Sequence, residues 1–148
     1  MNILFLCAGN VFRNQLAEYF LRELTKKHNV QSAGINFKKK YDVPLINIYK
    51  KKFYQLIKLF EKHGFKFEKQ KPKKITKEML DSADKIILIL EDKKLIPEYL
   101  KNNKKLIFWE VEDGVDENRK PKSLEKTSEI IITIKKLVKG LVKAINQC

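Results

Sequence analysis

The sequence predicts an α/β fold: a three-layer sandwich in which a four-stranded parallel sheet is flanked by helices. Short apolar runs alternate with segments of helical periodicity along the 148 residues, which favours strands connected by helices. The runs are apolar at consecutive positions, as in strands that are buried on both faces. The length fits a single domain over residues 1–148.

The first half of the chain predicts two strands and two helices. The run NILFLC, residues 2–7, is typical of a buried strand, and from about Arg13 onward apolar residues recur at helical spacing. HNVQSAG, residues 28–34, predicts a second strand. Helical spacing over 48–60 predicts the next helix, which Gly64 ends.

The second half predicts two further strands and three helices. A capping sequence at Thr76 begins one helix, and the apolar run 86–90 is the clearest strand of the chain. A short helix is predicted over 92–101 and a fourth strand over 104–109. A long helix is predicted from Ser123; its β-branched EIIITI segment would also suit a strand, but the helical spacing that follows favours a helix.

Positive charge is concentrated in one segment. The net charge is +14, and residues 38–77 contribute +11 of it with 14 Lys and 3 acidic residues. Such a segment can attract nucleic acid or anionic substrates. A solvated lysine-rich surface is the simpler interpretation, because no RNA-binding signature accompanies the lysines.

The remaining composition predicts a cytoplasmic protein without membrane contacts. No apolar stretch reaches the ~20 residues that span a bilayer, and the N-terminus lacks the basic region of a secretory signal. Cys7 and Cys148 are the two cysteines and lie at opposite ends of the sequence, which favours neither a disulfide framework nor a zinc site. We expect no cofactor and no metal.

The segment CAGNVFR, between the first strand and the first helix, can hold a phosphate group. Gly9 and Asn10 tolerate a tight turn, which directs backbone N–H groups inward. The helix start and the Arg13 fork add positive charge at the same place. Such surroundings lower a thiol pKa from ~8.5 to ~3.5–7.5, so we expect Cys7 to be an ionised nucleophile. The alternative is a small buried hydrophobic residue.

Several segments resemble the low-molecular-weight protein tyrosine phosphatase family. ILFLCAGNVFRNQLAEYFLRE, residues 3–23, is similar to that family's opening, a Cys-five residues-Arg loop at the start of a Rossmann-like domain. SAG at 32–34, ITKEMLDSADKIILIL at 75–90 and FWEVEDG at 108–114 match further blocks in the same order.

The resemblance implies a Rossmann-like low-molecular-weight phosphatase fold and hydrolysis of phosphotyrosine or aryl phosphate monoesters through a cysteinyl-phosphate. Cys7 would attack phosphorus, Arg13 would stabilise charge on the oxygens, and Asp113 would act as acid and then as base. The expected partner is a tyrosine-phosphorylated protein or an aryl phosphate. The phosphate-binding residues would be Ala8, Gly9, Asn10, Val11, Phe12 and Asn14.

The loop departs from the family pattern at two positions. Asn14 replaces a Ser or Thr, and its amide could still donate to the thiolate. Phe12 replaces a second cysteine, so we expect no local redox switch; Cys148 could substitute only if the C-terminus folded back. Val11, a branched apolar residue, favours phosphotyrosine over phosphoarginine.

The segment around Asp113, at the end of FWEVEDG (108–114), also departs from the pattern, and we call it the acid loop. Gly114 replaces a proline and would loosen the loop, which leaves Glu112 and Asp116 as alternative acids to Asp113. An aromatic pair that often follows is absent, and Phe37 and Tyr41 are candidates for the opposite wall of the cleft. Trp109 is predicted to pack at a strand end.

Two other functions remain open at the level of sequence. Arsenate reduction occurs on the same fold but needs further cysteines, and residues 8–147 contain none; Cys148 or an external thiol would have to serve. A non-catalytic domain that binds phosphate or, weakly, nucleic acid through residues 38–77 is the second alternative.

Overall fold

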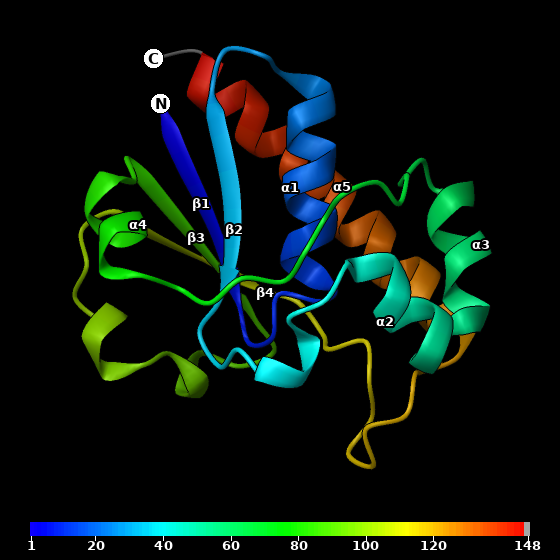
Figure 1. Cartoon of the computed structure of the whole chain (residues 1–148). Helices are drawn as coiled ribbons and strands as arrows, with labels where there is room; N and C mark the ends of the chain where they lie inside the picture. Colours follow the sequence, from blue (N-terminus) through cyan, green and yellow to red (C-terminus); the bar gives the residue numbers. More distant parts are fainter. Residues whose placement is uncertain (147–148) are drawn as a thin grey trace.

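Four parallel strands form the centre of the protein, whose computed structural model describes residues 1–146 (Figure 1). The strands are β1 (Asn2–Cys7), β2 (Asn29–Gly34), β3 (Lys85–Leu90) and β4 (Leu106–Glu110). They lie in the order β2-β1-β3-β4 and all pair in parallel. The predicted fold class and the four predicted strands are therefore confirmed. Cys7 pairs with Gly34 at the carboxyl end of this sheet.

Helices cover the two faces unequally. On one side lie α1 (Arg13–Leu24) and α5 (Leu124–Asn146), with α2 (Leu45–Lys52) and α3 (Tyr54–Lys62) beyond them (Figure 1). The other face is covered by α4 (Lys77–Ser82) and short 3₁₀ turns. Thr76 caps α4 by accepting a hydrogen bond of 3.1 Å from the N–H of Met79, as predicted. No helix within residues 1–146 is long and apolar enough to cross a membrane.

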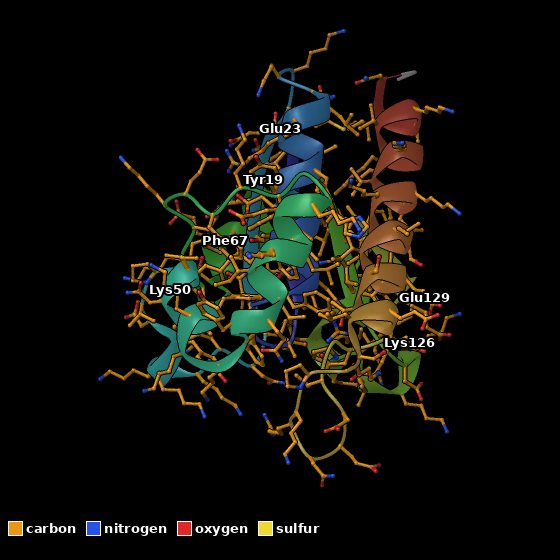
Figure 2. All side chains as sticks on the ribbon, turned by 90° about the vertical axis from the view of Figure 1, so that its right-hand side faces the viewer. Tyr19, Glu23, Lys50, Phe67, Lys126 and Glu129 are labelled. Atoms are coloured by element: carbon orange, nitrogen blue, oxygen red, sulfur yellow. The ribbon has the colours of Figure 1, made fainter. Side chains whose placement is uncertain are left out.

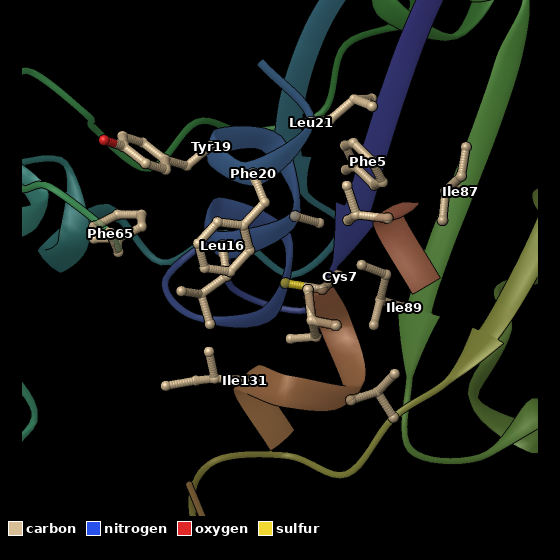
Figure 3. Packing of buried hydrophobic residues seen from close by; sticks show 14 of the residues in the cluster. Phe5, Cys7, Leu16, Tyr19, Phe20, Leu21, Phe65, Ile87, Ile89 and Ile131 are labelled. Carbon is tan, nitrogen blue, oxygen red and sulfur yellow. The ribbon is translucent and has the colours of Figure 1, made fainter. Parts of the chain in front are cut away.

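Alternate residues of β1 enter separate cores, since successive side chains of a strand point to opposite faces. Phe5 packs in the core under α1 and α5, whereas Leu4 and Leu6 pack in the core on the α4 side. Because both faces are covered, the strand is apolar at every inner position. Figure 3 shows the end of this first core, where the Cys7 sulfur lies near Leu16 of α1.

Two predicted helices are wrong in extent. The helix expected over 48–60 is interrupted at Phe53, whose φ of −134° and ψ of 41° leave the helical region; its ring packs instead on Tyr49, 5.5 Å away. Two 3₁₀ turns, η2 (Lys93–Leu95) and η3 (Glu98–Leu100), replace the helix expected over 92–101. Pro97 explains that break, because the residue before a proline avoids the helical conformation.

Candidate active site

A cavity of about 420 Å³ opens at the carboxyl end of β1. Ligands of parallel α/β sheets bind at this edge, where the strands end and the following loops begin. The cavity brings together residues that are far apart in the sequence. Its lining includes Cys7, Val11, Arg13, Tyr41, Phe53 and Asp113.

Cys7 lies at the inner end of this cavity and is 3% exposed. Burial raises the pKa of its thiol above the ordinary value, while the Arg13 charge and the backbone N–H groups of Asn14 and Asn10 lower it by less; Asp113 raises it further. The predicted lowering of the Cys7 pKa is therefore wrong in direction. The sequence reveals the cation and the helix start, but not the removal of water from the sulfur.

Arg13 begins α1 and is 3% exposed. Its Nη1 donates to the carbonyl of Val111 at 3.0 Å and lies 3.4 Å from Oε1 of Glu91, and its Nη2 lies 4.0 Å from Oδ1 of Asp113. Glu91 was missed by sequence reasoning, because it belongs to no motif; its position directly after β3 was the available signal. The guanidinium is thus fixed between Glu91, which follows β3, and the acid loop, with Nε free of hydrogen bonds to residues 1–146.

Asn10 gives the loop its shape. Its φ of 61° is left-handed, a conformation that asparagine tolerates better than most residues. Its buried side chain donates to Ser32 Oγ at 2.9 Å and accepts from the N–H of Lys73 at 2.8 Å and from Gln15 Nε2 at 3.2 Å. Gly9 was predicted to share this role but has no positive φ, and a Cβ there would lie in ordinary contact, 3.8 Å from Val11.

The SAG segment supports the loop from β2. A Cβ on Gly34 would lie 2.8 Å from the carbonyl oxygen of Ala8, so only glycine lets the two backbones approach. Ser32 holds Asn10 from the same strand. From α2, the hydroxyl of Tyr49 donates to the carbonyl of Val11 at 2.8 Å. Sequence reasoning missed this role of Tyr49, because the residue belongs to no motif and was noted only as an aromatic residue among the lysines of this segment.

Asn14 contacts the sheet through its side chain and the sulfur through its backbone. Its Nδ2 donates to the carbonyls of Ala33 at 2.7 Å and Phe5 at 3.4 Å. Its backbone N–H faces Cys7 and lowers the thiol pKa. The side chain was expected to donate to the thiolate, but its hydrogens are used elsewhere. Its buried Oδ1 has no hydrogen-bond partner within residues 1–146.

Of the three candidate acids, Asp113 lies best placed. It lines the cavity and is 37% exposed beside Arg13. Glu112 faces away and pairs at 3.5 Å with both Lys122 and Lys126. Asp116 also lines the cavity, but its Oδ1 accepts from the backbone N–H groups of residues 118 and 120 and so shapes the turn.

Gly114, which was expected to loosen the loop, is buried under the ring of Phe12. The Phe12 ring also stacks on Phe60 of α3, with centroids 5.6 Å apart. Gly114 accepts a hydrogen bond of 3.0 Å from the N–H of Lys122, which closes the loop. The acid loop is therefore held by packing and by its own backbone.

Of the predictions for aromatic residues, those for Tyr41 and Trp109 are confirmed and the one for Phe37 is wrong. Tyr41 lines the cavity as expected, but Phe37 is absent from its lining, and Phe53 lies there instead. Trp109 is 9% exposed and packs on Phe5, with centroids 5.8 Å apart, which confirms its role in packing.

Cys148 lies outside the described residues. Within residues 1–146, no three His, Cys, Asp or Glu side chains are grouped to hold a metal ion.

Comparisons with known proteins agree with this architecture. The sequence model of the family "Low molecular weight phosphotyrosine protein phosphatase" matches residues 2–147. A comparison with curated protein sequences finds no match.

Solved structures with the same fold differ in their named activities. A low molecular weight protein tyrosine phosphatase from T. tengcongensis is 21% identical, with a TM-score of 0.72 and coverage of 97% of this chain and 99% of the other. The YwlE arginine phosphatase from Geobacillus stearothermophilus is 18% identical, with a TM-score of 0.71 and coverage of 99% and 93%.

A third solved structure is the thioredoxin-dependent arsenate reductase of Corynebacterium glutamicum, which is 22% identical with a TM-score of 0.66. The match covers 99% of this chain but 62% of that protein's length. At these identities the three structures establish the fold and leave the substrate open.

Proposed function

Because the chain belongs to the low molecular weight phosphotyrosine protein phosphatase family, we propose that it is a cysteine-dependent phosphatase of phosphotyrosine or aryl phosphate monoesters. The observation that carries this proposal is the meeting of Cys7, Arg13 and Asp113 in one cavity. The reaction requires a nucleophile, a fixed cation to stabilise negative charge and a carboxyl group to transfer protons, and these three residues supply them.

In the first step, the Cys7 sulfur attacks phosphorus while the bond to the aryl oxygen breaks. Asp113, as a carboxylic acid, gives its proton to that leaving oxygen. Because the raised pKa keeps Cys7 as a thiol, the thiol proton must pass to a phosphate oxygen when the sulfur attacks. A thiol with a phosphate dianion holds as many protons as a thiolate with a monoanion, so this transfer needs no additional proton. Arg13 and the loop N–H groups stabilise the equatorial oxygens.

In the second step, a water molecule attacks the cysteinyl-phosphate. The Asp113 carboxylate takes a proton of the water as the sulfur–phosphorus bond breaks. The sulfur takes back the proton that the thiol gave to the phosphate oxygen, so Cys7 leaves as a thiol and phosphate is released into the cavity. The apolar Val11, Tyr41 and Phe53 on the cavity wall favour an aryl ring next to the phosphate. This supports phosphotyrosine as the substrate.

The test compares wild type with Cys7→Ser on para-nitrophenyl phosphate, phosphotyrosine and phosphoarginine. We expect hydrolysis of the first two by the wild type only, and a phosphorylated Cys7 in the mass spectrum of acid-quenched protein. Equal hydrolysis by the two proteins would refute the nucleophile, and a preference for phosphoarginine would refute the substrate class. Thiol-dependent turnover of arsenate without phosphatase activity would favour the reductase alternative.

A further inference from the structure

Three lysines lie at the cavity or next to its lining residue Tyr41, on the side of η1 (Lys39–Tyr41) and the end of α2. Lys38 lines the cavity itself. The ammonium groups of Lys40 and Lys52 lie 5.3 and 5.1 Å from the ring centroid of Tyr41, another lining residue. We call Lys38, Lys40 and Lys52 the lysine rim.

The lysine rim is not neutralised by the protein. None of its members has an ion pair within residues 1–146. Asp42, the single acidic residue in residues 38–60, is already paired with Lys71 at 2.7 Å. The helix dipole explains a cation such as Lys52 at the end of α2, but it does not explain Lys38 or Lys40, which precede the helix.

The ammonium groups of the lysine rim repel one another. The Tyr41 hydroxyl acts to raise the pKa of Lys40, but the charge of Lys52, partial desolvation and Lys38 outweigh it and leave the pKa of Lys40 lowered. A bound anion would relieve that repulsion. Figure 2 shows Lys50 on α2, next to this cluster in sequence, at one edge of the molecule and the pair of Lys126 and Glu129 on α5 at the other.

Another segment of the cavity lining has the other sign. Asp113, Asp116 and Glu117 belong to it, with Arg119 as its cation. The mouth is thus basic along η1 and α2 and largely acidic along residues 113–117. An extended chain whose phosphorylated side chain enters the cavity would pass one flank over each segment.

We propose that the lysine rim binds acidic residues on one side of the phosphotyrosine in a protein substrate, which gives the enzyme a preference for phosphotyrosine with a one-sided acidic flank. This inference rests on the proposed phosphatase function and adds the class of sequence around the phosphate. Paired surface charges each change affinity about twofold, so three together give about tenfold.

The experiment measures binding by fluorescence anisotropy with the Cys7→Ser variant, so it does not require turnover. Three labelled phosphotyrosine peptides of equal length carry three glutamates before the phosphotyrosine, three after it, or serines in their place. We expect one acidic peptide to bind about tenfold more tightly than the serine peptide at low salt, and the advantage to shrink in 0.5 M salt because the Debye length falls below ~8 Å.

Charge-matched variants assign the effect. K38Q/K40Q/K52Q should abolish the advantage of the acidic peptide, whereas K26Q/K27Q/K143Q, which removes the same charge from the opposite end of the sheet, should keep it. Equal binding of the three peptides, or equal losses in both variants, would overturn the proposal. Tighter, rim-dependent binding of a single-stranded RNA would overturn it in favour of a nucleic acid. Rim-dependent peptide binding without phosphatase turnover would support the rim and refute only the catalytic proposal.

Discussion

The ring of Phe12 occupies the space that a β-carbon at position 114 would need. An ideal Cβ on Gly114 would lie 2.4 Å from Cε2 of Phe12, far inside van der Waals contact. The ring cannot easily withdraw, because it stacks on the fully buried Phe60. The phenylalanine in the phosphate loop and the glycine in the acid loop are therefore one linked departure from the family pattern.

Gly114→Ala should destabilise the protein by about 1–3 kcal/mol, since overpacking displaces the ring or the loop. Urea unfolding measures this change. Adding Phe12→Ala should cost less than the two single losses together, because the ring that causes the clash is gone. Gly140→Ala is the control: a Cβ there meets nothing within 4 Å, so we expect a gain of about 0.5–1 kcal/mol in α5. Additive effects at positions 12 and 114 would contradict the linkage.

Asn10→Ala should destabilise the loop for two reasons that can be separated. The lost hydrogen bonds to Ser32 and Lys73 cost about 1–3 kcal/mol, and alanine at a φ of 61° costs about 1–2 kcal/mol more. Asn10→Gly should show only the first loss in thermal or urea unfolding. Gly9→Ala should stay within about 0.5 kcal/mol of wild type. A larger loss at Gly9 would show that the turn depends on the glycine instead.

The rate at which iodoacetamide alkylates Cys7 should have the pH dependence of a thiol whose pKa is raised. The reactive thiolate is the minor form at neutral pH, so the rate should rise about tenfold per pH unit and continue to rise beyond pH 9.0. Asp113→Asn should move the profile to lower pH and Arg13→Gln to higher pH, because the two charges act in opposite directions on the thiol. A plateau between pH 6 and 8 would mean that Arg13 and the amides outweigh burial.

Asp113→Asn should lower kcat by about 10²–10⁴-fold, the range for a lost general acid. The loss should be greatest for leaving groups of high pKa, which need the proton most, and it should remove the carboxylate limb of the pH–rate profile. Steady-state kinetics on a series of substituted phenyl phosphates measures this. Glu112→Gln, at a side chain that faces Lys122 and Lys126, should retain near wild-type rates; a comparable loss there would assign the acid to Glu112.

The sequence alone determined the order of strands and helices. The periodicity of apolar residues is a local property, and both faces of β1 are buried as its unbroken apolar run requires. The sequence also identified the loop between Cys7 and Arg13, because the number of residues that separates them is fixed by the chain itself. The family resemblance depended on the same local blocks, and the family match over residues 2–147 confirmed it.

Only the tertiary structure decided the quantities that depend on distant neighbours. Desolvation by the surrounding core reversed the expected direction of the Cys7 pKa shift, and ion pairs with α5 and its preceding loop turned Glu112 away from the cavity. Packing on Tyr49 accompanies the helix break at Phe53, and Phe12 explains Gly114. Burial and charge pairing are sums over residues that the chain brings together only on folding, so a local pattern cannot give their sign.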